Sequence, residues 1–107
     1  YEHPRSSFTA KFVGVTNLFE GDDARRLLSR VGSFTVRPED VELTESTEGH
    51  AATIAEVQYL GPVVHIHCVL DGGGKVIASA ASKGTSVVVG QRVRLAWSAD
   101  SVMAVGS

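Results

Sequence analysis

The stretch Phe34-Thr-Val-Arg-Pro-Glu-Asp-Val-Glu-Leu43 describes a strand that stops and then restarts in a new direction. Its first four residues alternate between apolar and polar side chains, which is typical of a half-buried strand. Pro38 ends this strand because it has no N–H to donate, and the polar pair after it favours a tight corner. Val41 and Leu43 then resume the alternation. This pattern predicts a sharp change of direction inside a mainly β domain.

The chain after the corner predicts short strands separated by turns. The apolar alternation of residues 52–59 changes phase at Ala55-Glu56, which indicates a β-bulge. A bend follows at Gly61-Pro62, and residues 71–74 indicate a hairpin turn to a partner strand at 75–81. The strand between these turns alternates cleanly, and its inward face comprises Val64, Ile66, Cys68 and Leu70.

The last part of the chain continues the same pattern. After a turn at Gly90-Gln91, apolar and polar side chains alternate up to Trp97, and residues 99–101 turn the chain into a short strand at 102–105. We expect Trp97 and Phe34 to lie in the core. Five or six short strands at this spacing predict a small barrel or sandwich.

A short helix is predicted in residues 1–16. Pro4 suits a first helical position, Phe8 and Phe12 share one apolar face, and Gly14 can end the helix. So short a helix needs a surface to pack on. Two interpretations stay open: the helix caps the β domain, or its proper partner lies outside this chain.

A second helix is predicted at residues 22–31, with Asp22 as its N-cap and Gly32 as its closing residue. The apolar side chains of this segment recur at helical spacing. We expect its arginines to form a solvated face rather than a phosphate site. These arginines are Arg25, Arg26 and Arg30.

Composition narrows the class of protein. The 107 residues include ten Lys and Arg and twelve Asp and Glu, so the net charge is −2 and a dedicated nucleic-acid binder is disfavoured. The single Cys68 has no internal disulfide partner, which favours a reducing, cytoplasmic location. The sequence begins at Tyr1 without Met, and we interpret it as a fragment of a longer chain.

The histidines are the first candidates for chemistry. His65 and His67 project from one face of a predicted strand, whereas Cys68 projects from the other. His3 and His50 are distant in sequence. A closed zinc site needs four well-placed ligands, so we interpret these histidines as surface residues and predict no metal site.

The remaining polar motifs predict no catalytic or cofactor site either. Glu39 and Asp40 are adjacent at an exposed corner, which gives no reason for a raised carboxyl pKa. Asp71-Gly-Gly-Gly74 lacks the Lys and Ser or Thr of a phosphate-binding loop and is better explained as a hairpin turn. Arg92 and Arg94 alone make a thin basic stripe for single-stranded nucleic acid.

Several motifs, taken together and in order, resemble a known family. Tyr1-Glu-His-Pro4, the Phe8–Gly14 segment and Asn17-Leu18 resemble the end of the nucleotide-binding domain in importer-type ABC transporter ATPases. Val36-Arg-Pro-Glu-Asp-Val41, Val57-Gln-Tyr-Leu-Gly61 and Gly90-Gln-Arg-Val-Arg-Leu-Ala-Trp97 resemble the TOBE regulatory domain that follows it, a small OB-like barrel. The resemblance implies that residues 1–16 end the upstream domain and that residues 17–107 form the TOBE domain.

One interval departs from the family pattern. The family opens its barrel with a strand hairpin between the Asn-Leu entry and the Arg-Pro-Glu strand. Here that interval is short and carries the predicted helix at 22–31 instead. The identity of the first barrel strand therefore stays open.

The resemblance implies a non-catalytic regulatory and dimerisation domain of an importer ATPase subunit, of the spermidine/putrescine or iron type. ATP and Mg²⁺ would be bound upstream. The implied partners are a second copy, the upstream ATPase domain and the membrane subunits, at the cytoplasmic face of the cell membrane. Possible interface residues are Arg37, Pro38, Glu39, Tyr59, Leu60, Gly61, Phe8 and Phe12. Two alternatives are a free-standing barrel that binds an oxyanion or a polyamine and a single-strand nucleic-acid-binding OB domain.

Overall fold

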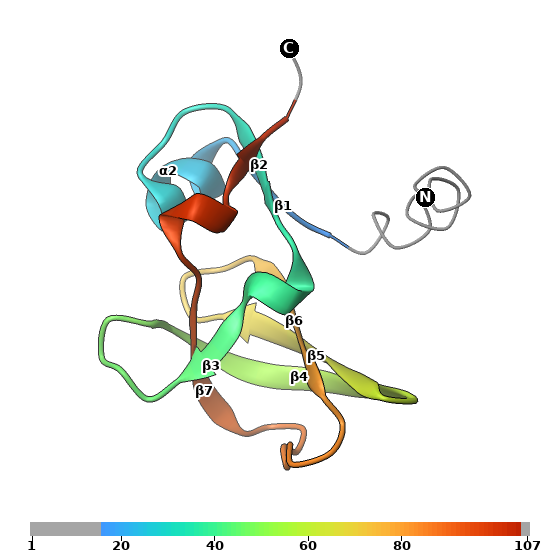
Figure 1. The fold of residues 1–107 in the computed structure, drawn as a ribbon. Coiled ribbons are helices and arrows are strands. Elements are labelled where there is room, and N and C mark those ends of the chain that lie inside the picture. The colour runs from blue at the N-terminus through green and yellow to red at the C-terminus, as the bar shows by residue number, and fades with distance from the viewer. Residues whose placement is uncertain (1–15, 106–107) are drawn as a thin grey trace, which may run out of the picture.

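The computed structural model describes residues 16–105, and the expectations for residues 1–15, including Phe8 and Phe12, lie outside that range. Eight strands, one α-helix and two 3₁₀ turns make up the described chain (Figure 1). In order they are β1 (Asn17–Glu20), α2 (Asp22–Leu28), β2 (Ser33–Val36), η1 (Pro38–Asp40), β3 (Glu42–Thr44), β4 (His50–Leu60), β5 (Val63–Leu70), β6 (Lys75–Ala81), β7 (Arg92–Ala96), η2 (Ala99–Ser101) and β8 (Met103–Ala104).

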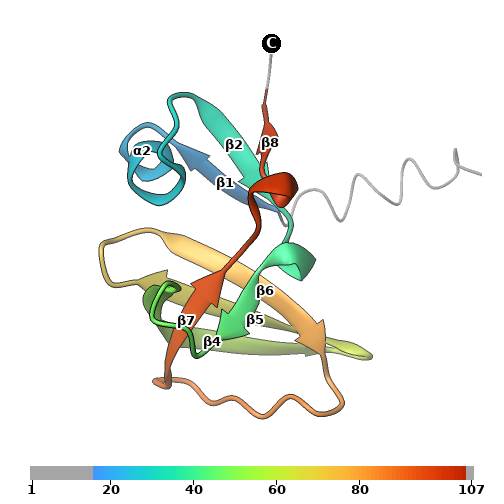
Figure 2. The same cartoon turned by 60° about the vertical axis from the view of Figure 1, so that its left-hand side comes forward.

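The strands form two antiparallel sheets that face each other. The smaller sheet has the order β1-β2-β8, and the larger has the order β3-β7-β4-β5-β6. Figure 2 shows the smaller sheet and α2 lying over one face of the larger sheet. The larger sheet curls until its edge strands β3 and β6 touch, but it does not close by hydrogen bonds between them. The predicted mainly β, OB-like architecture is confirmed.

The predicted number of five or six strands was too low. Four of the eight strands in residues 16–105 have only two to four residues: β1, β2, β3 and β8. Over so few residues, an alternating pattern carries little signal. The opening strand of the domain, which the sequence left open, is β1, and it pairs antiparallel with β2 from Asn17↔Val36 to Glu20↔Ser33.

The predicted corner is where the chain passes from one sheet to the other. β2 belongs to the smaller sheet and β3 to the larger sheet, and η1 joins them. The turn is closed by the Asp40 N–H, which donates to the Arg37 carbonyl at 2.9 Å, and by the Val41 N–H, which donates to the Pro38 carbonyl at 3.1 Å. Pro38 itself is buried. The change of direction is therefore a change of sheet.

The α-helix begins at Asp22 but ends three residues earlier than predicted. Asp22 is its first residue rather than its N-cap, which is Gly21 at φ 60°. The helix ends at Leu28 because Ser29 takes a left-handed conformation (φ 58°), and the N–H groups of Ser29 and Arg30 donate back to the carbonyls of Arg25 and Ala24. Gly32 therefore does not close the helix.

The bulge, the hairpin turns and the buried face of β5 lie where the sequence predicts them. A register shift between Ile54 and Glu56 is the predicted bulge, and the two hairpin turns fall at 61–62 and 71–74. The inward face of β5 and the Phe34 ring are buried, as predicted. Trp97 is only partly buried and packs against this core. No helix in the described part of the chain is long and apolar enough to cross a bilayer.

Candidate functional site

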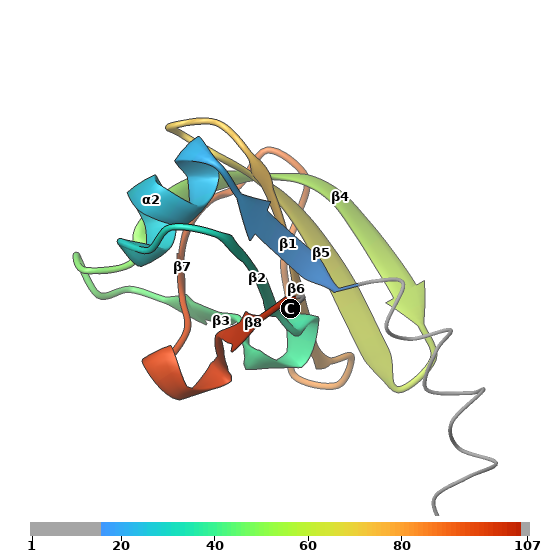
Figure 3. The ribbon, with the colours of Figure 1, turned by 90° about the horizontal axis from the view of Figure 1, so that it is seen from above.

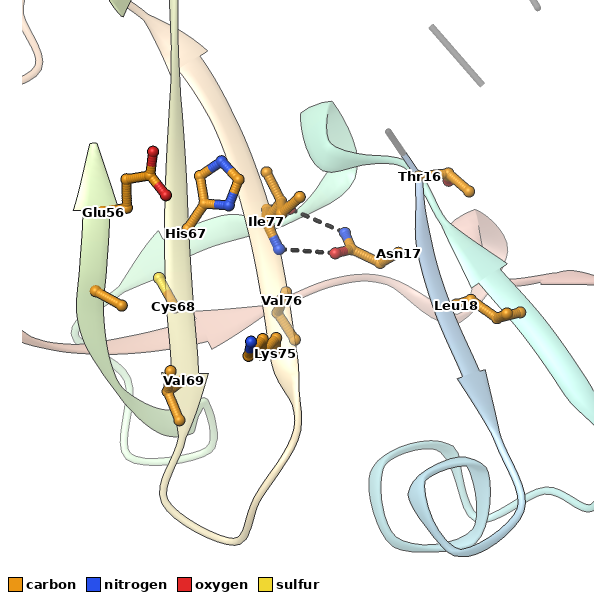
Figure 4. Close-up of a pocket in the computed structure, with 11 residues that line it drawn as sticks. Thr16, Asn17, Leu18, Glu56, His67, Cys68, Val69, Lys75, Val76 and Ile77 are labelled. Atoms are coloured by element: carbon orange, nitrogen blue, oxygen red, sulfur yellow. Dashed lines mark hydrogen bonds between the residues drawn. The ribbon is translucent and has the colours of Figure 1, made fainter. Parts of the chain in front are cut away.

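A hollow of about 310 Å³ lies where β1 meets β5, β6 and the bulge (Figure 4). Its charged and titratable lining consists of Glu56, His67 and Lys75, together with the buried thiol of Cys68. These groups are of mixed charge and do not form a site for one kind of ion. The one buried polar side chain at its border is that of Asn17.

Asn17 joins the two sheets through its side-chain amide. Its Oδ1 accepts a hydrogen bond from the Ile77 N–H at 2.7 Å, and its Nδ2 donates to the Ile77 carbonyl at 2.9 Å and to the Val36 carbonyl at 3.1 Å. Figure 4 shows the first two of these bonds. The amide thus imitates the backbone of a neighbouring strand at the edge of β6. Since its donor and acceptor atoms are already bonded, Asn17 has a structural role in this hollow.

The His65 and His67 side chains lie on the outer face of β5, and Cys68 lies on the inner face, as predicted. His67 Nε2 is 2.9 Å from Gln58 Oε1 on β4. Burial raises the pKa of the Cys68 thiol to about 11, which keeps it protonated and unreactive. Within residues 16–105, no group of three or more His, Cys, Asp or Glu side chains is arranged to hold a metal ion.

Zinc should therefore bind this chain only weakly. In a titration followed by calorimetry, we expect no stoichiometric submicromolar site, and the double variant His65→Ala, His67→Ala should unfold at nearly the same urea concentration as the parent. A tight stoichiometric site that disappears in the double variant would contradict this prediction.

The Arg37-Pro38-Glu39 corner has a structural role. The Arg37 and Glu39 side chains are exposed, and their closest charged atoms, Nη1 and Oε2, are 3.8 Å apart. An exposed pair at that distance contributes little to stability. Pro38 is the buried member of the motif and fixes the turn between the sheets.

The arginines predicted to be solvated are exposed, but two of them make specific contacts. Arg26 donates to the carbonyls of Gly72 and Gly73 at 2.8 and 2.6 Å and pairs with Asp23 at 3.0 Å, so α2 is fastened to the β5–β6 turn. The Arg30 guanidinium lies 5.6 Å from the centre of the Phe34 ring. The Asp71–Gly74 turn thus leads into a strand and offers carbonyls to a cation, which does not fit a phosphate-binding loop.

The two arginines of β7 are also engaged within the domain. Arg92 makes two hydrogen bonds to the Asp71 carboxylate, at 2.6 and 2.7 Å, and a third to Thr53. The hydrogen bonds from Arg92 hold the pKa of Asp71 below its ordinary value. Arg94 donates to the Gly49 carbonyl at 3.0 Å. Because both guanidinium groups already donate to groups of this domain, the thin basic stripe has few free donors for nucleic acid.

An aromatic stack spans the space between the sheets. Trp97 follows β7 and stacks on Phe19 of β1 at 5.5 Å between ring centres and on His50 of β4 at 4.9 Å. Burial, followed by the positive charge of Arg26, lowers the pKa of His50 from its ordinary value of 6.5. The folded domain therefore favours the neutral imidazole.

This pKa shift predicts a fall in stability on mild acidification. The folded state disfavours protonated His50, so the unfolded state takes up more protons as the pH falls through 6.5, and the free energy of unfolding decreases. The His50→Phe variant keeps a ring in the stack but has no group to titrate. Urea unfolding at pH 7.5 and pH 5.5 should therefore show a smaller loss for the variant than for the parent. Equal losses in both proteins would exclude His50 as the cause.

The tip of the β4–β5 hairpin exposes apolar side chains. Tyr59 is 62% exposed and Leu60 is 49% exposed. Gly61 turns the chain at φ 79°, and its carbonyl accepts a 2.6 Å hydrogen bond from the Ser82 hydroxyl. The predicted interface residues therefore separate into a buried corner at Pro38 and an exposed apolar hairpin tip. The two groups do not form one site.

Fold and surface together define a small β domain built from two facing antiparallel sheets. The family model described as "TOBE domain" matches residues 34–105, and the chain belongs to that family. The resemblance found in the sequence is thereby confirmed.

Two curated relatives are ATP-binding proteins of ABC transporters. The chain is 38% identical over 106 residues to the uncharacterised ABC transporter ATP-binding protein YdcT of Escherichia coli K12, covering 94% of this chain and 32% of the relative. It is 26% identical over 134 residues to the spermidine/putrescine import ATP-binding protein PotA of Rubrobacter xylanophilus, covering 99% of this chain and 36% of the relative. The chain thus spans about a third of the length of the curated relatives it matches.

Proposed function

We propose that this chain is the C-terminal regulatory and dimerisation domain of an ABC importer ATPase subunit. The observation that carries the proposal is the similarity to an ABC transporter ATP-binding protein over 94% of this chain but only 32% of the relative. The remaining two thirds of such a protein would hold ATP and Mg²⁺ and would contact the membrane subunits. The subunit would work at the cytoplasmic face of the membrane. Among substrates, the relative named for spermidine and putrescine favours a polyamine over iron.

The domain itself is proposed to be non-catalytic. Its only glycine-rich turn joins β5 to β6 within residues 16–105 and is occupied by Arg26. The purified 107-residue chain should therefore neither bind nor hydrolyse ATP. A coupled phosphate-release assay tests this. Turnover that stays proportional to the chain through successive purification steps would refute the proposal.

Dimerisation is proposed to use apolar surface that the described domain does not bury. The Tyr59-Leu60 hairpin tip is one such surface, and Phe8 and Phe12 are the other candidates from the sequence. Burying one Phe contributes roughly 1.5–3 kcal/mol, so two phenylalanines could add appreciably to a pair of domains.

Sedimentation velocity of three proteins tests this dimerisation. The full chain should form a concentration-dependent dimer. The Phe8→Ser, Phe12→Ser variant and a truncation that begins at Asn17 should already dissociate at protein concentrations at which the full chain is still dimeric. If all three have the same oligomeric state and concentration dependence, the two phenylalanines take no part in the assembly.

A further inference from the structure

Strand β4 has one edge that stays open over its second half. Residues 50–53 of β4 pair with β7, and Ile54 bonds the loop at Gly90 and Gln91. Beyond the bulge, residues 56–60 pair with β5 on one side, and no strand in the described range 16–105 pairs with them on the other. Figure 3 shows this part of β4 at the outer rim of the sheet.

The outward-facing backbone groups of this edge follow from the Asn17 contact. Because Asn17 bonds both the N–H and the C=O of Ile77, Ile77 turns its backbone away from β5. Alternation across the antiparallel ladder then places the groups of His67 toward β4 and those of its partner Glu56 toward β5. The next residues outward are therefore Val57 and Tyr59, whose N–H and C=O groups point to the open side.

Beyond the bulge, this edge lacks two residue types that often protect a sheet edge. Lys and Pro are absent from residues 56–60, and Tyr59 and Leu60 expose apolar surface there. The edge of β6, in contrast, is covered by Asn17 and by the neighbouring turn η1. An unprotected edge with apolar side chains is a template for another strand.

We infer that β4 of a second copy pairs antiparallel with this edge, with Gln58 on the two-fold axis. In that register Val57 of each copy exchanges two backbone hydrogen bonds with Tyr59 of the other, and the larger sheets of the two copies become continuous. Gln58 faces Gln58 as a non-hydrogen-bonded pair, in which side chains approach most closely. The inference rests on the proposed dimerisation and identifies the surface that performs it.

The charges of the strand suit this self-pairing. Glu56 is the only charged side chain in residues 56–60, and the two-fold register places it opposite Leu60 of the second copy rather than opposite the other Glu56. No like charges therefore face each other directly. Tyr59 of each copy lies next to Val57 of the other, so its exposed ring gains an apolar neighbour. A two-fold axis requires a surface to be complementary to itself, and this strand meets that condition.

A charge exchange at Gln58 tests the register. The variants Gln58→Lys and Gln58→Glu each place two like charges across the axis, and each should raise the dissociation constant of the homodimer about fivefold in low salt. An equimolar mixture of the two should form a heterodimer at least as tight as the parent dimer. Lys75→Glu is the control, because it changes an exposed charge on β6 that lies away from the axis. It should leave the dissociation constant unchanged.

Amide hydrogen exchange gives a second readout that needs no variant. The Val57 and Tyr59 amides should exchange slowly in the dimer and quickly after dilution, whereas the Gln58 amide, which faces β5, should change little. If the parent chain is dimeric but both Gln58 variants keep its dissociation constant, the edge inference is wrong and the dimerisation proposal stands. If the parent chain is monomeric at every concentration, both are wrong.

Discussion

Replacing Asn17 with alanine should lower the free energy of unfolding by about 2–4 kcal/mol. The change removes three hydrogen bonds and leaves the N–H and C=O of Ile77 without their partner at a partly buried sheet edge. A buried polar group that loses its partner costs about 1–3 kcal/mol, and the two Ile77 groups are affected together. For a domain of this size the midpoint of thermal unfolding should fall by roughly 10–20 °C.

A neighbouring substitution separates this effect from the general cost of altering the start of β1. Thr16 donates from its hydroxyl to the same Val36 carbonyl at 3.3 Å, but within residues 16–105 its side chain forms no hydrogen bond to β6. Thr16→Val should therefore cost less than about 1 kcal/mol. Urea unfolding followed by circular dichroism measures both variants. Similar losses for the two would mean that the bridge to β6 contributes little.

The second large loss is expected for Trp97→Ala, at about 3 kcal/mol. The indole lies between the Phe19 and His50 rings and so connects β1 of the smaller sheet with β4 of the larger. Removal of a large aromatic side chain from such a contact leaves a cavity, and stacked pairs add to the cost of the lost burial. Trp97→Phe keeps a ring between the sheets and should cost about half as much.

Trp97 is the only tryptophan of the chain, so its replacement also removes the main fluorescence signal. Unfolding is therefore best followed by far-ultraviolet circular dichroism. Val88→Ala, at an exposed position, supplies the baseline for a substitution outside the core. A Trp97→Ala variant as stable as Val88→Ala would show that the stack does not hold the sheets together.

Local patterns were sufficient to predict the features that depend on neighbouring residues. The Arg-Pro-Glu corner, the bulge at residue 55 and the two hairpin turns each rest on a few consecutive side chains, and all were correctly predicted. The predicted end of the helix was wrong because Ser29 adopts a left-handed conformation, which residues other than glycine adopt only rarely.

The contacts that join the sheets could not be predicted in the same way. Asn17 bonds a residue 60 positions away, and Arg26 bonds carbonyls 46 and 47 positions away. Alternation assigns a residue to a face but does not say which distant strand that face meets. The sequence marks the Asn17-Leu18 pair only as part of a family motif, and the bridging role of Asn17 depends on β1 lying beside β6. The open edge of β4 likewise depends on where β7 stops.

The Asn17 bridge gives the domain a mechanical property as well as stability. A pull on the chain at Thr16 reaches β2 through the β1–β2 ladder and the Asn17 bond to Val36, and it reaches β6 through the two Asn17 bonds to Ile77. Both sheets are therefore loaded at the same time. Bonds loaded together resist more force than bonds that open one after another. A displacement of the chain at the beginning of β1 would therefore move the two sheets together as one rigid body.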